Sequence, residues 1–236
     1  MKCFLKIISI GLGGIVVLGL GLVAARYWRI SNPTEKADIE LPDTSVSFES
    51  DRGQKLLSAA SSADHSSLSD TFKVQQKASW CGVASAVTVL NANGASLTQN
   101  EFFTDRVTDV RPWLDTTFTG MPIGDLAQML EVHGVNVEVK RARSSTLEAF
   151  RDSLKSNMSD SSNWLIVNYG RSELGEEGGG HVSPISAYSS KKDMALILDT
   201  AGYKYPFHWV PVDSLFEAME TSDSETGKSR GWVVVR

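Results

Sequence analysis

The residues best suited to chemistry are a cysteine, a histidine and an aspartate that follow one another along the chain as Cys81, His181 and Asp199, with Gln75 ahead of the cysteine. A thiolate attacks carbonyl carbon, an imidazole moves its proton to a leaving amine, and a carboxylate orients that imidazole. The amide of Gln75 and the backbone N–H of Cys81 are suited to holding the oxyanion of a tetrahedral intermediate. This chain order predicts acyl transfer through a cysteine nucleophile of the papain-like kind.

The local sequence also indicates how these groups are positioned. Apolar residues recur at helical spacing from Cys81 to Asn91, and Gly94 follows as a stop signal, so Cys81 is expected in a first helical turn. The exposed amides of such a turn favour thiolate over thiol. A hairpin break at residues 189–192 allows two adjacent antiparallel strands to present His181 near one strand start and Asp199 near the other strand's end.

The order of elements predicts an α+β fold, with helices in the first half and a largely antiparallel sheet in the second. Further helix signals are two capping boxes, Thr98 with Glu101 and Ser145 with Glu148, a periodic stretch Ile123–His133 before Gly134, and an N-cap at Asp213. Strand patterns cover residues 135–139, 164–167, 182–188, 195–198, 207–210 and 232–235.

The N-terminus is expected to enter or cross a membrane. From Ile7 to Ala25 the only non-apolar side chain is Ser9, and this stretch as a helix spans roughly 28 Å, about the thickness of a bilayer core. The small residues at 23–25 suit signal-peptide cleavage, whereas the Tyr27-Trp28 pair suits a retained anchor, and the sequence leaves both open. The domain is therefore expected to be exported: anchored facing the periplasm or another extracytoplasmic side, or periplasmic after cleavage.

These signals divide the chain into three parts. Residues 1–30 are the signal anchor or signal peptide, 31–46 a linker, and 47–236 the catalytic domain, within which Ser58–Asp70 is predicted to be a surface loop. A net charge of -5 gives no electrostatic reason to expect nucleic acid as a partner. The sequence leaves a homodimer open.

The cysteine and histidine content limits the metal and disulfide chemistry that can be expected. Beyond residue 45 the only cysteine is Cys81, so the domain cannot form an internal disulfide, and on cysteine count alone a buried structural thiol and a reactive thiol are equally supported. The other histidines, His65, His133 and His208, lack metal-ligand spacing, so no protein metal site is predicted. We interpret His133 as a helix-end residue that interacts with the helix dipole.

Beyond these patterns, the chain from about residue 47 to 236 closely resembles the phytochelatin synthases. The matching stretches are Trp80–Ser85, Val89–Asn91, Gly179–Ile185, Asp193–Asp199, Tyr203–Pro206, His208–Pro211, and Thr226–Lys228 with Arg230–Gly231. The resemblance implies a papain-like fold and a glutathione γ-glutamylcysteinyltransferase. Cys81 would attack the Cys-Gly peptide bond of glutathione and release glycine, and the γ-Glu-Cys acyl group would pass to water or to a second glutathione in heavy-metal detoxification.

The resemblance further implies a substrate pocket and a route for metal. Residues expected near glutathione are Asn168, Tyr169, Arg171, Gly180, Tyr205 and Arg230, with the two arginines suited to carboxylates. The run Glu176–Gly180 beside His181 is expected to form a flexible rim. No cofactor is required; cadmium, zinc or copper ions are expected to arrive as glutathione thiolate complexes, because one protein cysteine cannot build a soft-metal site.

Two residues depart from the family pattern: Gly202 stands where the family commonly has Arg, and Phe207 where it commonly has a second Pro. The cysteine-rich C-terminal domain of the plant-type proteins is not expected here. We therefore hypothesise that hydrolysis of glutathione outruns polymerisation. Two alternatives remain open: a peptidase of the bacteriocin-processing type, which also pairs an early Gln with Cys-Gly, and a non-catalytic thiol module that binds metal or responds to redox state.

Overall fold

The computed structural model describes residues 19–34 and 39–236. Its labelled strands are β1 Val46–Ser47, β2 Val137–Arg141, β3 Trp164–Gly170, β4 Gly180–Ser189, β5 Met194–Ile197, β6 His208–Pro211 and β7 Gly231–Val235. The labelled α-helices are α2 Asp51–Ser58, α3 His65–Thr71, α4 Cys81–Ala92, α5 Asp105–Val110, α6 Trp113–Thr119, α7 Ile123–Val132, α8 Leu147–Asn157 and α9 Val212–Glu220. Two short 3₁₀ helices are η1 Ala142–Ser144 and η2 Arg171–Leu174.

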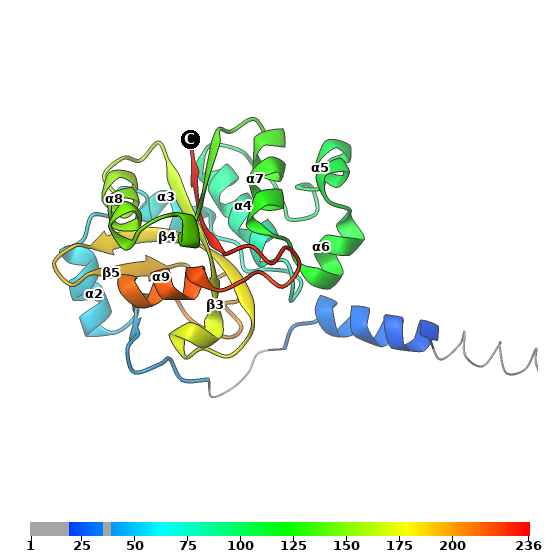
Figure 1. Ribbon diagram of the computed structural model, residues 1–236, viewed down its shortest axis with the longest axis horizontal. Coiled ribbons are helices and arrows are strands. Elements are labelled where there is room, and N and C mark those ends of the chain that lie inside the picture. Colours follow the sequence, from blue (N-terminus) through cyan, green and yellow to red (C-terminus); the bar gives the residue numbers. More distant parts are fainter. Residues whose placement is uncertain (1–18, 35–38) are drawn as a thin grey trace, which may run out of the picture.

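The strands form one sheet with helices on both faces (Figure 1). Its order is β1-β6-β5-β4-β3-β7-β2, and all neighbouring strands run antiparallel. Side chains alternate between the faces: in β3, Ile166 joins the core with α3, α4 and α7, whereas Leu165 and Val167 join the core with α8 and α9. The predicted α+β class is confirmed, and the helices formed by the first half of the sequence cover one face of the sheet.

Most predicted elements lie where their patterns placed them. Helix α4 begins at Cys81 and ends before Gly94, whose φ of 93° suits glycine, and α7 ends before Gly134 with φ of 88°. Each strand pattern of the second half corresponds to an observed strand within two residues at each end, except that β3 continues three residues beyond its pattern, to Gly170. Asp213 lies in the first turn of α9, behind an N-cap at Pro211.

Both capping-box predictions need correction. Thr98 and Glu101 do exchange the reciprocal hydrogen bonds of a capping box, but these close a turn, and the next helix begins after Thr104, whose Oγ1 accepts from the N–H of Val107. The buried ring of Phe102 follows directly, so burial of that side chain takes precedence over extending a helix. Helix α8 is capped by Thr146, one residue beyond the expected Ser145.

The surface loop predicted at residues 58–70 is also wrong in part. Helix α3 begins within it, and Leu68 is fully buried in the core against α4. A single well-placed leucine is enough to hold a short polar helix on the domain, because the remaining side chains can face solvent. Composition alone gave no periodic signal for this segment.

The hairpin β4–β5 carries an irregularity that matters for the site. Ile185 lies opposite Ile197, but Ala187 lies opposite Leu196, so β4 contains one extra residue at Ser186. The turn that follows is closed at Asp193, whose carboxylate accepts from the Tyr188 hydroxyl at 2.8 Å and pairs with Arg151. The hairpin break expected between residues 189 and 192 is thus confirmed.

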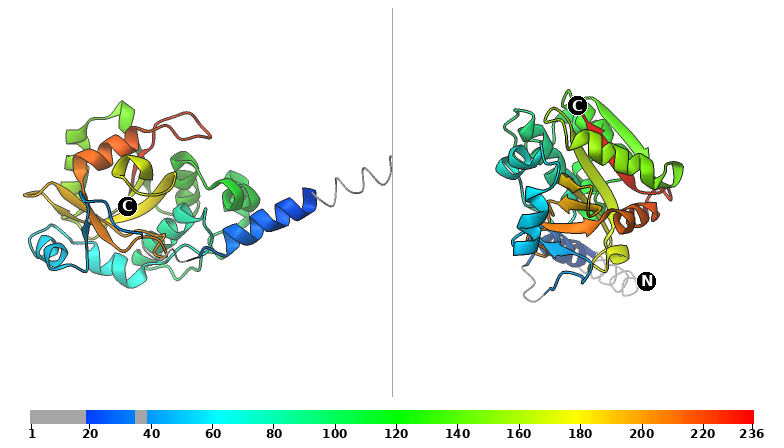
Figure 2. Two further views of the ribbon diagram at one scale, coloured as in Figure 1. Left: turned by 90° about the horizontal axis from the view of Figure 1, so that it is seen from below. Right: turned by 90° about the vertical axis from the view of Figure 1, so that its left-hand side faces the viewer.

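A helix over residues 19–31, drawn in blue, projects to one side of the domain and meets it only at its last turns (Figures 1 and 2). The Tyr27 ring lies 6.4 Å from that of Trp113 and 6.2 Å from that of Phe118, and Ile30 O accepts from the Ala78 N–H at 2.8 Å. Within residues 19–34 and 39–236, the helices lack the length and apolar character needed to span a bilayer. Residues 7–18 of the predicted membrane segment lie outside the described part of the chain.

Candidate active site

Cys81 is the first residue of α4, as predicted, and the start of this helix is held by its aromatic neighbour. Trp80 is fully buried, donates from Nε1 to Thr117 Oγ1 at 3.2 Å and packs edge-on against Trp113. Ser85, one turn into the helix, donates to Cys81 O at 2.8 Å and lies 3.1 Å from Val182 O, which ties α4 to β4. Cys81 itself is partly buried and forms no disulfide within the described residues.

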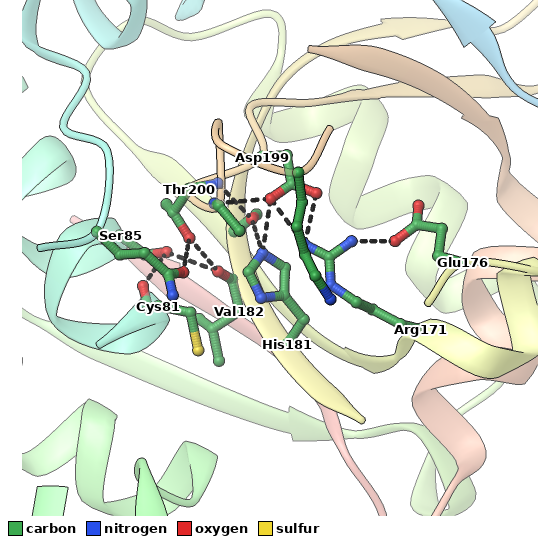
Figure 3. Close-up of polar contacts among 12 residues, drawn as sticks. Cys81, Ser85, Arg171, Glu176, His181, Val182, Asp199 and Thr200 are labelled. Carbon is green, nitrogen blue, oxygen red and sulfur yellow. Dashed lines mark hydrogen bonds and ion pairs between the residues drawn. The ribbon is translucent and has the colours of Figure 1, made fainter. Parts of the chain in front are cut away.

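The three predicted catalytic residues come together (Figure 3). His181, the second residue of β4, lies beside Cys81 in the same cavity and donates from Nε2 to Asp199 Oδ1 at 2.9 Å. Asp199 follows the end of β5 by two residues, so adjacent antiparallel strands present the pair in the arrangement expected. Ser183 Oγ lies 3.0 Å from the same imidazole nitrogen and was not anticipated.

The electrostatics favour a thiolate–imidazolium pair. Burial raises the pKa of the Cys81 thiol, but the hydrogen bond and charge of His181, with backbone hydrogen bonds at Val182 and Gly82, lower it below its ordinary value. Burial and the charge of Arg171 lower the pKa of His181, whereas the carboxylate of Asp199 outweighs them and leaves it above the ordinary value. A lowered thiol pKa and a raised imidazole pKa widen the pH range in which both groups are charged.

Arg171 was expected to contact substrate, and the structure places it elsewhere. Its guanidinium is buried and donates from Nη2 to both carboxylate oxygens of Asp199, at 2.8 and 2.7 Å, and from Nη1 to Glu176. A carboxylate of the protein has taken the place of the expected substrate carboxylate. Glu176 is likewise buried, so the expected flexible rim is confined to the exposed residues 177–180.

Gln75 lies close to the nucleophile but is already engaged. Its amide nitrogen lies 3.1 Å from Lys77 O, 2.8 Å from Ala78 O and 2.9 Å from the hydroxyl of Tyr203, which provides three acceptors for two hydrogens. The side chain therefore braces the segment that leads into Cys81. Its role as an oxyanion donor stays a prediction.

A cavity of about 470 Å³ opens beside Cys81 and His181, a size typical of small-molecule sites. Its wall carries two arginines, Arg111 and Arg230, and the acidic residues Asp115, Asp223 and Glu225. None of these acidic residues or Arg111 stood out in the sequence, because they are brought together from the end of α5, from α6 and from the loop between α9 and β7. The cavity is lined by both signs of charge.

The two arginines of the cavity differ in how fully they are bound. Arg111 donates to Gly120 O, Thr119 Oγ1, Asp125 and twice to Glu225, so it fixes the wall. Arg230 donates from Nη1 to Asn168 Oδ1 at 2.9 Å and lies 3.6 Å from Asp223 Oδ2, and its buried Nε has no hydrogen-bond partner within the described residues. Arg230 thus has fewer partners than Arg111, and a guanidinium that lines a cavity is suited to an incoming carboxylate.

Gly180 makes room for Arg230. A Cβ atom at Gly180 would lie only 2.4 Å from Arg230 Nη1, so any side chain there would displace the guanidinium. Gly180, Asn168 and Arg230 all line the cavity, and their contact with substrate stays a prediction. Tyr169 and Tyr205 do not: the Tyr169 ring packs edge-on against His181 at 5.7 Å, and the Tyr205 ring lies under Arg171.

The family model for phytochelatin synthase matches residues 36–232. The chain belongs to the phytochelatin synthase family. It is similar to glutathione gamma-glutamylcysteinyltransferase 3 of Lotus japonicus, 37% identical over 170 residues, which cover 70% of this chain and 36% of that relative.

Two further relatives extend the comparison. Glutathione gamma-glutamylcysteinyltransferase 1 of Arabidopsis thaliana is 35% identical over 170 residues, covering 70% of this chain and 35% of the relative. The glutathione gamma-glutamylcysteinyltransferase of Schizosaccharomyces pombe is 23% identical over 209 residues, covering 83% of this chain and 50% of the relative. This phytochelatin synthase family member therefore spans about a third of the length of the plant relatives and half of the S. pombe protein.

The two residues that depart from the phytochelatin synthase pattern, Gly202 and Phe207, lie outside the catalytic group of Cys81, His181 and Asp199. A Cβ atom at Gly202 would meet Val74 Cγ2 at 3.2 Å, so a longer residue requires Val74 to move. The ring of Phe207 packs edge-on against that of Phe72, with ring centroids 4.7 Å apart. Neither residue lines the cavity beside Cys81.

The pairing of Cys81 with His181 can be tested by the pH dependence of alkylation. In the native protein the rate of reaction with iodoacetamide is expected to rise through a midpoint below about 8.5, the ordinary thiol value. His181→Ala removes the imidazolium while burial remains, so the midpoint should move upward. Mass spectrometry of the peptide that contains Cys81 measures the rate without interference from Cys3. His133→Ala is the control, and an unchanged midpoint in His181→Ala would contradict the ion pair.

Proposed function

We propose that this protein is a glutathione γ-glutamylcysteinyltransferase that also hydrolyses glutathione. The observation that carries the proposal is Cys81 at a helix start, beside a His181 that is hydrogen-bonded to Asp199, in a cavity that Arg230 also lines. The names of the relatives support glutathione as the donor. We also propose that the α+β fold is of the papain-like type, because a helix-borne thiol faces a sheet-borne histidine.

In the first step the thiolate of Cys81 attacks the carbonyl carbon of the Cys-Gly bond of glutathione. The carbonyl electrons move onto oxygen, near the backbone N–H of Cys81 and, as predicted, the amide of Gln75. When the tetrahedral intermediate collapses, the C–N bond breaks and His181 donates its proton to the leaving nitrogen, so glycine departs as a neutral amine. A thioester between the γ-Glu-Cys group and Cys81 remains.

In the second step water or the amino group of another glutathione attacks the thioester carbonyl. His181 accepts the proton from the attacking group, the C–S bond breaks, and Cys81 returns as thiolate. Attack by water yields γ-Glu-Cys, and attack by glutathione yields a longer (γ-Glu-Cys)n peptide.

The charge pattern of the cavity fits such a substrate. Glutathione carries two carboxylates and one ammonium group. Arg230 offers guanidinium donors for a carboxylate, and Asp115 provides an acidic group near an ammonium, whereas Glu225 is paired with Arg111 and Asp223 with Arg230. Metal ions would enter bound to the substrate thiol, because Cys81 is the one cysteine among the described residues and is itself the nucleophile.

The proposal is tested by mixing the purified full chain with glutathione and measuring protein mass and released glycine. We expect a γ-Glu-Cys adduct on Cys81 and glycine in solution, and neither from Cys81→Ser. A Ser85→Ala variant, which keeps the nucleophile, serves as a control for handling and folding. Cleavage of longer peptides without any glutathione adduct would instead support the peptidase, and metal binding lost in Cys81→Ser without any turnover would support the thiol module.

The acceptor is tested by adding cadmium to glutathione and separating the products by chromatography. We expect free γ-Glu-Cys to exceed oligomeric peptides, because Gly202 and Phe207 depart from the family pattern. Gly202→Arg is an informative variant, since it restores the common residue. Abundant long oligomers from the native chain would refute the predominance of hydrolysis.

We also propose that the protein is held at an extracytoplasmic membrane surface by its N-terminus. Supporting this, Leu20, Leu22 and Trp28 of the helix at 19–31 are more than half exposed, and Leu114 of α6 is exposed on the element to which that helix docks. The docking contacts come from residues 26–31, which remain whether or not cleavage follows Ala25.

Membrane fractionation of cells expressing the full chain, with mass analysis of the mature N-terminus, distinguishes the two forms. An intact N-terminus in a carbonate-resistant membrane fraction indicates an anchor. A chain starting near residue 26 in the soluble exported fraction indicates a signal peptide. An intact chain in the soluble cytoplasmic fraction would contradict the proposal.

A further inference from the structure

A chain of buried charged groups continues beyond the catalytic residues. Asp199 is bound by Arg171, Arg171 by Glu176, and Glu176 Oε1 lies 2.9 Å from His208 Nε2. The side chains of Asp199, Glu176 and His208 have no exposed surface, and that of Arg171 is 3% exposed. The signs alternate along the chain from Asp199 to His208, and His208 has no role in the mechanism described above.

The hydrogen bonds of His208 indicate where a proton resides. Its Nδ1 lies 2.8 Å from Pro206 O, which can only accept, so Nδ1 carries a hydrogen. Its Nε2 faces a carboxylate oxygen of Glu176, which also accepts when ionised. If His208 were neutral and Glu176 ionised, a lone pair on Nε2 would face a lone pair on the carboxylate oxygen. The His208–Glu176 pair therefore holds one additional proton, which lies between these two atoms.

The same residues have the donor set of a small metal site, but the structure fills it differently. Glu176, Asp199 and His208 each place one ligand atom within 4.8 Å of the others. Both carboxylates are already bound by the guanidinium of Arg171, which supplies the positive charge that a cation would bring. The cluster is therefore organised around arginine and a proton.

We propose that Glu176 and His208 are positioning residues for the reaction: the proton they share neutralises Glu176, which leaves Arg171 free to hold Asp199 and thereby orient His181. Without that proton, Asp199 and Glu176 would carry two buried negative charges for one guanidinium. Arg171 would then interact more strongly with Glu176, and its hydrogen bonds to Asp199 would weaken. The proposal rests on the proposed function only for its turnover measurement.

The surroundings of His208 support this assignment. The charged and titratable groups near its ring are Glu176, Asp199, Arg171 and Tyr205, whose ring centroid lies 6.2 Å away. Burial lowers the pKa of His208, but the hydrogen bond and charge of Glu176 and the charge of Asp199 outweigh it and raise the pKa above its ordinary value. The stabilisation from this pair is therefore fully present below the ordinary imidazole pKa and lost as pH rises through the raised pKa.

Two substitutions separate charge from packing. His208→Gln keeps a donor toward Glu176 but cannot carry the extra proton's charge, so a buried negative charge is left over. Glu176→Gln removes that negative charge, and its amide can accept from Arg171 and donate to a neutral His208, so every hydrogen bond is satisfied. The double variant Glu176→Gln/His208→Gln has no surplus charge and should behave more like the native chain than His208→Gln does.

The experiment compares these full-length variants by the pH midpoint of Cys81 alkylation and by kcat and KM for glutathione. For His208→Gln we expect a higher midpoint, because surplus negative charge disfavours the thiolate. We also expect kcat lower by about tenfold with little change in KM, the scale seen when an outer hydrogen-bond partner of an active-site group is lost. Glu176→Gln and the double variant should have midpoints close to native, and His133→Ala is the control for loss of a histidine.

Three results would overturn the proposal: a native midpoint and kcat in His208→Gln, equal impairment of His208→Gln and the double variant, or a shifted midpoint in Glu176→Gln. If circular dichroism shows that His208→Gln does not fold, the shared proton is tested instead by measuring the thermal unfolding of the native chain and of Glu176→Gln across a range of pH. The native chain should lose stability at alkaline pH as His208 is deprotonated, whereas Glu176→Gln should lose less. Identical pH dependence of the two unfolding midpoints would then refute the shared proton. The alkylation result holds even if glutathione is not the substrate.

Discussion

The hydrogen bond between His181 and Asp199 is the interaction on which this site depends. It joins the second residue of β4 to the residue just beyond β5, and it is fully buried. A carboxylate in such surroundings is stable only when it is well paired, because burial disfavours the ionised form. Asp199 meets this condition with His181, Arg171 and the backbone N–H of Ala201, so its pKa lies well below the usual range although burial alone would raise it.

The catalytic residues could be predicted from the sequence, whereas the residues that hold them in place could not. Cys81 could be placed because helix starts have local signals, and His181 and Asp199 could be placed because a hairpin break separates two strand patterns. Arg171 could not be assigned correctly, since a guanidinium suits a carboxylate of the protein as well as one of a substrate. Only the fold reveals that Asp199 and Glu176 lie within its reach.

The same limit applies to the fold as a whole. Periodic helices and alternating strands were predictable to within a few residues, because their signals are local. Helix α3 was missed because one buried leucine, Leu68, holds it, and the Thr98–Glu101 capping box closed a turn because Phe102 had to be buried. The acidic wall of the cavity was also invisible, since α6 and the loop before β7 meet only in three dimensions.

The extra residue in β4 has a consequence for catalysis that reaches beyond its own position. Because successive side chains on a strand point to opposite faces, inserting or deleting one residue inverts everything on one side of the irregularity. Ser186 lies between the part of β4 that packs beside the closing turn and the part that carries His181. If β4 lacked the extra residue, its apolar side chains near the turn could stay buried, but the imidazole of His181 would then lie on the other face of the strand, away from the sulfur of Cys81. The face of β4 on which His181 lies is thus set by the β-bulge at Ser186. The hydroxyl of Ser186 lies 3.1 Å from Nδ1 of His65.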